Sequence, residues 1–144
     1  MEYEMYFTFI LQLLLAVLLG GILGWQREHI GKPAGPRTYA IVCVGATLFT
    51  IMSLQGFGAD TARVAAQILT GIGFLGAGII MHQEGGVVVG LTTAAGLWVV
   101  AAVGMAIGIM WFWQAIVATM IIFAVMSVND NNISKKSLKK KRKK

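Results

Sequence analysis

Four side chains with metal-binding chemistry stand at two points of this chain. Glu28 and His29 are adjacent, while His82 and Glu84 are two residues apart. Two carboxylates and two imidazoles could bind a divalent transition metal, and the carboxylates alone could hold a hydrated magnesium ion, which prefers oxygen ligands. The alternative is that these groups are solvated or paired with a basic neighbour such as Arg27. We favour this alternative and expect no bound cofactor, with magnesium as the ion that the carboxylates would suit.

A second charged pair, Asp60 and Arg63, has helical spacing. Residues three apart share one face of a helix, so the two side chains can form an ion pair, and Asp60 is also placed to cap the helix. Arg63 leads directly into an apolar run, where an ionisable residue is by default a functional candidate. Arg37 precedes another apolar run in the same way. The candidate functional charges are therefore Arg27, Glu28, Arg37, Asp60, Arg63 and Glu84.

The elements that must position these charges are five apolar stretches that fill most of the 144 residues. A helix of about 20 apolar residues crosses the hydrocarbon of a bilayer, and somewhat shorter ones cross where the bilayer thins. The sequence therefore predicts an all-α, polytopic transmembrane helical bundle over residues 1–128, followed by a lysine-rich tail over 129–144. Its five predicted spans cover about 5–25, 38–54, 64–81, 91–109 and 111–128.

The boundary between the last two spans is the least defined, because only Met110 separates them. One helix over residues 91–128 would measure about 57 Å, far longer than a bilayer core of roughly 30 Å. We therefore predict a hairpin that reverses between Gly104 and Gln114. The aromatic residues 111–113 would then lie at the level of the headgroups.

Basic residues predict the orientation. Arg27, Lys32 and Arg37 follow the first span, and eight of the twelve basic residues lie in the tail. Both segments should face the cytoplasm. Four spans separate them, which agrees with an outer N-terminus and a cytoplasmic C-terminus. The N-terminus lacks the basic region of a cleavable signal, so we expect the first span to be retained.

The tail sequence KKSLKKKRKK suits the negatively charged surface of a membrane. Each basic residue near anionic lipids contributes about 1 kcal/mol of attraction. The tail has no aromatic residue for base stacking and no nucleic-acid-binding motif beside it, so we expect no nucleic-acid partner. Its simpler role is that of a topology anchor without a specific ligand.

Small residues four apart predict where helices approach closely, as in membrane helix pairs. Ala16, Gly20 and Gly24 share one helix face, and Gly73 with Ala77 repeats the spacing. The segment GIGFLGAG matches a dinucleotide-binding glycine pattern, but it lies in mid-span without the required strand, so we reject that function. A local helix break there stays open. The predicted packing glycines are Gly20, Gly24, Gly71, Gly73, Gly76, Gly78, Gly104 and Gly108.

These glycine-lined helix faces, which we call seams, would join helices within one chain or between copies of the chain. We favour some contact in a homo-oligomer. The apolar spans contain no Asp, Glu or Lys at mid-depth, whereas a dedicated cation pathway usually places acids around an interior cavity. The chain also lacks a nucleophile elbow, a P-loop and a metalloprotease helix. We therefore expect no enzyme, and the acid-poor interior argues against a magnesium channel.

Together, three ordered motifs resemble the membrane domain of the MgtC/SapB family. The first is GGILGWQREHIGKPAGPRTYAIVCVGATLF, which includes Arg27, Glu28 and Arg37. The second is DTARVAAQILTGIGFLGAGII, with Asp60, Arg63 and Gln67. The third is GLTTAAGLWVVAAVGMAIG, whose motif residues are Thr92, Thr93, Trp98 and Gly104.

This resemblance implies a bacterial inner-membrane protein linked to growth in low magnesium and, for some members, to survival inside host phagocytes. It also implies regulation of other membrane machines, such as the proton-driven ATP synthase. The better-studied members carry a folded cytoplasmic domain where this chain has its lysine-rich tail. Our leading hypothesis is a non-enzymatic modulator of ion homeostasis that packs against a partner complex. The alternative is a magnesium transporter that uses Glu28, Asp60 and Glu84.

Overall fold

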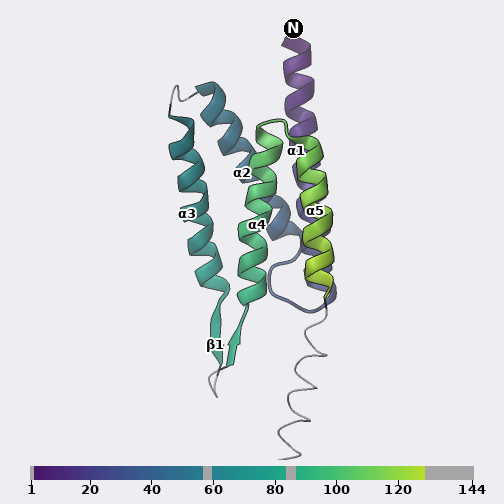
Figure 1. Cartoon of the computed structure of the whole chain (residues 1–144), viewed down its shortest axis with the longest axis vertical. Helices are drawn as coiled ribbons and strands as arrows, with labels where there is room; N and C mark the ends of the chain where they lie inside the picture. Colours follow the sequence, from purple (N-terminus) through teal and green to yellow (C-terminus); the bar gives the residue numbers. More distant parts are fainter. Residues whose placement is uncertain (1, 57–59, 84–86, 129–144) are drawn as a thin grey trace, which may run out of the picture.

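The computed structural model describes residues 2–56, 60–83 and 87–128 and consists of helices with one short hairpin of strands (Figure 1). The all-α class and five helices are as predicted. The elements are, in order, α1 (Glu2–His29), α2 (Pro36–Gly56), α3 (Thr61–Ile79), β1 (Met81–Gln83), β2 (Val87–Val89), α4 (Leu91–Gly108) and α5 (Phe112–Ser127).

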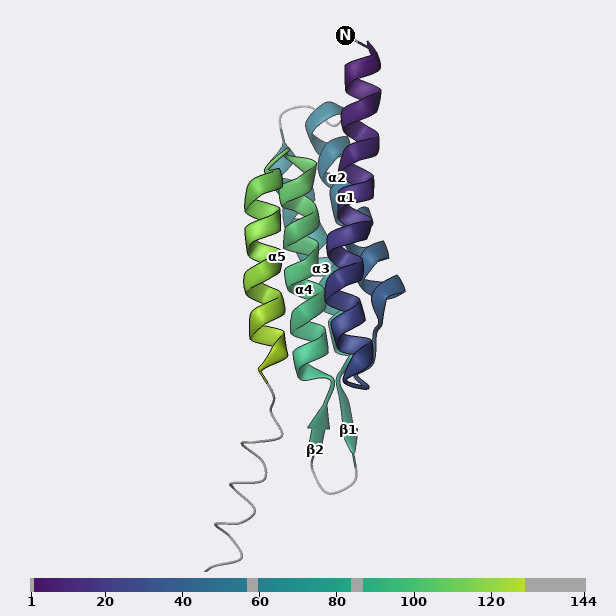
Figure 2. The ribbon, with the colours of Figure 1, turned by 90° about the vertical axis from the view of Figure 1, so that its right-hand side faces the viewer.

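Helices α1, α2 and α4 form the centre of the bundle and make its most extensive contacts. Helix α5 packs on α4 and α1, while α3 packs on α4 and α2 at the opposite side (Figures 1 and 2). The first turns of α1 project beyond the other helices, where Tyr3 is 89% exposed. Successive helices alternate in direction, so one end of the bundle gathers the end of α1 and the start of α4.

Four helices, α1 to α4, are long and apolar enough to cross a membrane. Helix α5 is equally apolar but has 16 residues, which gives a length of about 24 Å, shorter than a bilayer core of roughly 30 Å. The helices begin and end within a few residues of the predicted spans. The difference at the end of the first span changes the position of Arg27. Helix α1 runs on to His29, so Arg27 lies in its last turn and not in the loop where the sequence placed it.

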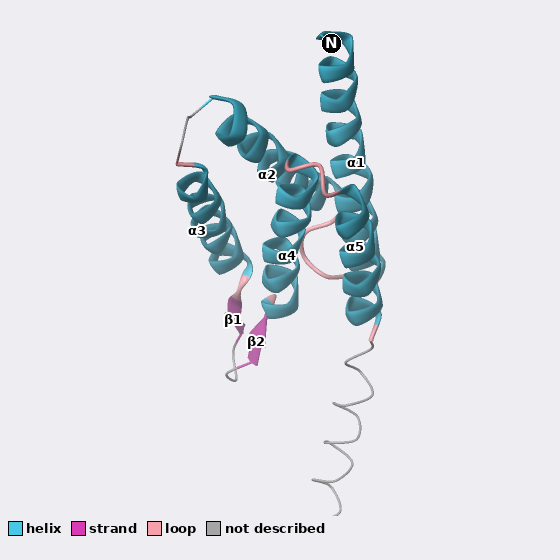
Figure 3. Ribbon diagram, turned by 45° about the horizontal axis from the view of Figure 1, so that its top comes forward, coloured by secondary structure: helices cyan, strands magenta, loops and turns pink. Residues whose placement is uncertain are grey.

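Helix α3 ends at Ile79, two residues before the end of the third predicted span, and Met81 already belongs to β1. The strands pair antiparallel, with Met81 opposite Val89 and Gln83 opposite Val87 (Figure 3). The sequence predicted only a loop over this segment. Three consecutive valines favour extended backbone because their branched side chains fit a pleated strand.

The reversal between α4 and α5 confirms the predicted hairpin. Helix α4 ends with a Schellman motif, in which Trp111 N–H donates to Ala106 O at 2.8 Å and Met110 N–H to Ile107 O at 2.9 Å. Met110 has a φ of 63°, a left-handed conformation that usually selects glycine. Helix α1 ends in the same motif, with Gly31 at the left-handed position.

The predicted glycine seams of α1 and α4 both close against α2. A Cβ at Gly20 would lie 2.8 Å from Tyr39 O, and one at Gly24 would lie 2.7 Å from Gly35 O. On the other side of α2, a Cβ at Gly104 would overlap the carbonyl of Cys43, and one at Gly108 would lie 2.6 Å from Thr50 Cβ. These four glycines therefore let two helices approach α2 at backbone distance, as the spacing indicated.

The glycines of α3 are only partly filled within the chain. The helix is continuous from Thr61 to Ile79, which decides against the local break that the sequence left open. Gly76 faces α4, with Ala94 Cβ 3.5 Å from where its own Cβ would be, whereas the positions of Gly71, Gly73 and Gly78 have open space around them. The expected seam of α3 is thus not filled within the chain.

Candidate functional site

Arg27 is the centre of a buried polar cluster where α1, α2 and α4 meet. It is 2% exposed, and its Nη2 donates to Thr93 Oγ1 at 3.3 Å. Tyr39, at the start of α2, donates from its hydroxyl to the Thr93 carbonyl at 3.2 Å. Arg27 Nε has no hydrogen-bond partner among the described residues. A guanidinium offers five N–H donors, so this cluster leaves much of its capacity unused.

Gln26 joins the cluster to α5. Its Nε2 donates to the carbonyl of Met126 at 2.8 Å, near the end of α5. This bond fixes the orientation of the amide and leaves Oε1 buried without a partner in the described structure. Buried polar atoms are nearly always hydrogen-bonded, so two unpaired atoms on adjacent residues mark this end of α1 as unusual.

Gly96 makes the cluster sterically feasible. A Cβ at this position in α4 would overlap the Tyr39 hydroxyl and the terminal methyl of Met126. Any larger residue would therefore push the Tyr39 hydroxyl away from Thr93 or shift the end of the Met126 side chain. The absence of a side chain at Gly96 lets the side chains of Tyr39 and Met126 both reach α4 at this level.

A cavity of about 740 Å³ opens beside the cluster, between the ends of α1 and α5 and the first turn of α4. The ends of these three elements lie on the same side of the bundle (Figures 1 and 2). Gln26 and Arg27 are its buried polar lining, and His29, Lys32 and Thr92 add further polar groups. Apolar side chains from the end of α5 and from Ile30 complete its wall.

The other charged candidates lie at the surface. Glu28 is exposed and packs against Gly35 of the following loop. His29 is also exposed, and its ring lies 4.1 Å from that of Trp25, centroid to centroid. Glu84 is outside the described residues, and His82 is described only as a backbone position in β1. Among the residues that the structure describes, no three acidic, histidine or cysteine side chains gather as a metal site.

Asp60 and Arg63 form the predicted ion pair, with Oδ2 and Nη1 3.4 Å apart on exposed side chains. Asp60 occupies the N-cap position of α3, but its side chain makes no capping hydrogen bond, which corrects that part of the prediction. The carboxylate turns to Arg63 instead. The pair lies at the opposite end of the bundle from Arg27 and Glu28, and Arg37 is exposed at the start of α2.

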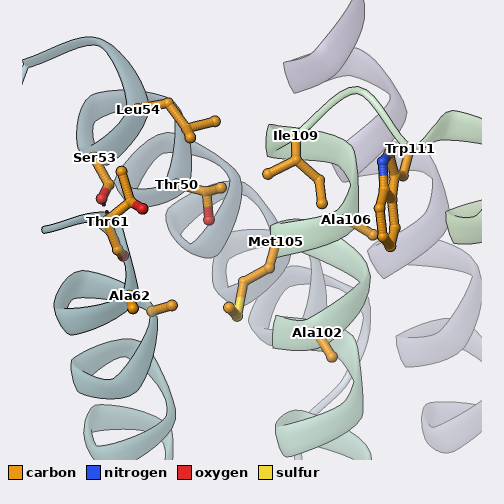
Figure 4. A pocket seen from close by; sticks show the side chains of 11 residues that line it. Thr50, Ser53, Leu54, Thr61, Ala62, Ala102, Met105, Ala106, Ile109 and Trp111 are labelled. Carbon is orange, nitrogen blue, oxygen red and sulfur yellow. Dashed lines mark hydrogen bonds between the residues drawn. The ribbon is translucent and has the colours of Figure 1, made fainter. Parts of the chain in front are cut away.

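Two further hollows border α3. One, of about 370 Å³, lies between the end of α2, the start of α3 and the end of α4, where Thr50, Ser53 and Thr61 provide its hydroxyls (Figure 4). The Ser53 hydroxyl donates to the Thr61 carbonyl at 3.3 Å. The other is a groove of about 630 Å³ between α2 and α3, lined mostly by apolar side chains and by Arg63, Gln67 and Gly71.

Of the motif polar residues, the structure brings only Thr93 into the buried cluster. Thr92 lines the cavity beside it, Gln67 lines the α2–α3 groove, and Trp98 is half exposed on α4. Gln26, Tyr39 and Gly96 were not among the residues that the sequence predicted for a site. The available signal was the adjacent pair Gln26–Arg27 at the end of an apolar helix, since polar side chains there need partners from other helices.

The comparison with known families agrees with the three motifs. The family model described as "MgtC family" matches residues 13–133, which include the whole buried cluster and both ends of the bundle. The chain belongs to the MgtC family. Together with four helices that are long and apolar enough to cross a membrane, this family membership supports the membrane protein that the sequence motifs predicted.

Its MgtC-family relatives include "Protein MgtC" of Salmonella typhimurium, 46% identical over 84% of this chain and 52% of the relative. "Putative magnesium transporter YhiD" of Escherichia coli K12 is 41% identical over 83% of this chain and 60% of the relative. An uncharacterized protein of Haemophilus influenzae is 40% identical over 77% and 51%. The chain thus spans half to three fifths of these relatives. No solved structure matches it.

Proposed function

We propose that this MgtC-family protein is a non-enzymatic membrane protein that modulates magnesium homeostasis by packing against a partner membrane complex. The observation that carries the proposal is the open face of α3 that carries Gly71 and Gly78, which lie about two helical turns apart. A Cβ added at either position would meet nothing within 4 Å, whereas Gly20 and Gly24 of α1 and Gly104 and Gly108 of α4 are filled by α2. Small residues at an unfilled helix face allow close approach of another membrane helix.

The groove between α2 and α3 supports the same function. It lies beside Gly71 and is lined by apolar side chains, with Gln67 and Arg63 as its polar groups. A transmembrane helix with a small-residue face would fit there, and Gln67 would offer a hydrogen bond of about 1 kcal/mol inside the membrane. The occupant would belong to a membrane complex, such as the ATP synthase that the family resemblance implies, or to a second copy of this chain.

The proposed setting is the bacterial inner membrane, crossed five times with the N-terminus outside. The short α5 would cross as the second arm of a hairpin with α4, where local thinning of the bilayer costs fractions of a kcal/mol per Å. The basic residues Lys32 and Arg37 and the lysine-rich tail would then lie on the cytoplasmic side, where anionic lipids would attract them.

The glycine face is tested by two substitutions of equal size. Gly71→Leu should abolish support of growth at limiting magnesium while the protein stays in the membrane at normal amount, because the side chain blocks the open face beside the groove. Gly21→Leu is the matched control: it also enters open space, but on α1. Equal growth of both variants and the wild type would contradict the proposal. If Gly71→Leu is lost from the membrane, Gly71→Ala takes its place, and we expect it to lose part of its support of growth.

The alternative function is a magnesium transporter, favoured by the name of the Escherichia coli relative. Its candidate acids Glu28 and Asp60 lie at opposite ends of the bundle, so they would act at the two mouths of a pathway. The purified chain in liposomes with a magnesium-sensitive dye separates the two functions. Our proposal predicts no entry above that of empty liposomes. Magnesium entry that is lost in Asp60→Ala or Glu28→Ala would establish transport instead.

A further inference from the structure

We propose that the cavity beside Arg27 binds a phosphate group that carries a hydrogen-bond donor, either the headgroup of a membrane phospholipid or a soluble phosphate. This site is distinct from the α3 face on which the proposed function rests. It lies at the end of the bundle formed by α1, α4 and α5, and none of its lining residues borders the α2–α3 groove.

The charge of Arg27 requires a partner. A charged side chain is almost never fully buried unless it is paired, because its desolvation is costly. Arg27 is 2% exposed, and among the described residues no acidic side chain forms an ion pair with it. Its one recorded side-chain hydrogen bond is long and goes to a neutral hydroxyl, that of Thr93. An anion in the adjoining cavity would supply the missing negative charge.

The surroundings favour phosphate over a simple halide. Arginine forms paired hydrogen bonds with phosphate oxygens because its fork of N–H groups matches their spacing. Lys32 lines the same cavity and adds a second positive charge. Thr92, in the first turn of α4, lines it too, and that turn starts at Gly90 without a side-chain cap. The first N–H groups of a helix have no intrahelical partner and bind anions.

The unpaired Gln26 Oε1 requires that the ligand also carry a hydrogen-bond donor. Because Gln26 Nε2 is held by the Met126 carbonyl, Oε1 is left as a buried acceptor that needs a donor. A chloride or sulfate ion offers none. A monohydrogen phosphate has a P–O–H group, phosphatidylglycerol has hydroxyls, and phosphatidylethanolamine has an ammonium group. Each could satisfy Arg27 and Gln26 together after a small shift of the two side chains.

The cavity also has the apolar wall that a lipid needs. Val125 and Val128 of the α5 end, with Ile30, contribute its apolar lining. These side chains lie at the end of two membrane helices, where the headgroup and the first carbons of an acyl chain meet. Basic pockets between helices at this depth bind lipid headgroups in other membrane proteins. A soluble phosphate would use only the polar half of the cavity.

The test uses the full chain purified in a maltoside detergent, which carries no phosphate. Binding is measured as the rise in melting temperature with added phosphatidylglycerol, phosphatidylethanolamine, phosphatidylcholine, inorganic phosphate or sulfate. We expect half-saturation by the preferred phosphate ligand to rise about tenfold in Arg27→Gln, the loss expected for a charged hydrogen bond. Arg37→Gln is the matched control, because it removes the same charge from an exposed position at the same end of the bundle. It should change half-saturation by less than about twofold.

The ligands that bind show whether the phosphate belongs to a lipid headgroup or to a soluble compound. Arg27-dependent binding of the donor-bearing lipids alone assigns the site to a lipid headgroup, and Arg27-dependent binding of inorganic phosphate assigns it to a soluble phosphate. Lys32→Gln, whose side chain is exposed, provides the same comparison if Arg27→Gln does not fold, with a rise of about threefold expected. The proposal would be overturned if Lys32→Gln and Arg37→Gln weakened binding equally. It would also be overturned if sulfate and phosphatidylcholine bound as well as the ligands that carry a hydrogen-bond donor.

Discussion

At the scale of single residues, glycines decide which helix faces close within this chain. Gly104 lies where any Cβ would overlap the Cys43 carbonyl of α2, and Gly73 lies where a Cβ would meet open space. The same change at the two positions should therefore have opposite consequences. The difference isolates backbone contact, since both residues are in the interior of apolar helices.

Gly104→Ala should lower the free energy of unfolding by about 1–3 kcal/mol, the usual cost of forcing extra volume into a packed interface. It would also disturb Thr47, whose hydroxyl lies 2.9 Å from the Gly104 carbonyl. Gly73→Ala should leave stability unchanged or slightly higher, because alanine has the better helix propensity. Reversible unfolding in mixed micelles measures both. Equal effects of the two changes would mean that the α2–α4 contact has room for a methyl group at Gly104.

The sequence was a good guide to such glycines and a poor guide to Arg27. Glycine spacing is local, so Gly20, Gly24, Gly104 and Gly108 could be assigned to packing faces from the chain alone. The burial of Arg27 depends on Thr93, 66 residues away, and on α5 beyond it. Nothing within one helix encodes how three helix ends meet, so the sequence placed this side chain in a loop.

At the scale of elements, the turn between α4 and α5 holds a methionine in a conformation that glycine adopts more readily. A left-handed conformation costs an ordinary residue about 1–2 kcal/mol, and glycine loses roughly 0.5–1 kcal/mol of that advantage through entropy. Met110→Gly should therefore raise the free energy of unfolding by about 0.5–1 kcal/mol. Met110 is exposed, so little packing is lost.

Met120→Gly is the control for this prediction, because Met120 is similarly exposed but lies inside α5 with helical backbone. It should lower the free energy of unfolding by about 1 kcal/mol, the usual cost of glycine within a helix. Unfolding curves of the two variants in the same micelles should shift in opposite directions. A loss of stability in both would show that the Met110 side chain, and not its backbone, holds the turn.

The elements themselves were predictable to the extent that apolar length defines them. Five apolar runs correspond to five helices. The long apolar stretch over residues 91–128 forms two helices, as predicted from its length relative to a bilayer, and the turn between them lies beside the aromatic residues 111–113. The β1–β2 hairpin was missed because such short strands have no periodicity to detect. Its signal was chemical: a run of valines, 87–89, preceded by the glycine pair at 85–86.

At the scale of the whole molecule, the two ends of the bundle differ in charge. One end has Arg27, Lys32 and Arg37 against Glu28, while the other has the Asp60–Arg63 pair, whose charges cancel. An excess of basic residues in short loops marks the cytoplasmic side. The orientation that this excess predicts would also present the Arg27 cavity to the inner leaflet and the cytoplasm, where phosphate compounds are available to it.

Cysteine labelling in spheroplasts tests this orientation directly. Native Cys43 is fully buried and provides a silent background. Gln55→Cys, exposed at the end of α2, should react with a membrane-impermeant maleimide in intact spheroplasts, whereas Lys32→Cys, exposed in the loop between α1 and α2, should react only after permeabilisation. Lys32 precedes α2 and Gln55 lies in its last turn, so if α2 crosses the membrane the two positions must be on opposite sides. The reverse pattern would place the basic end outside, and the ligand of the Arg27 cavity would then have to come from the outer leaflet or the periplasm.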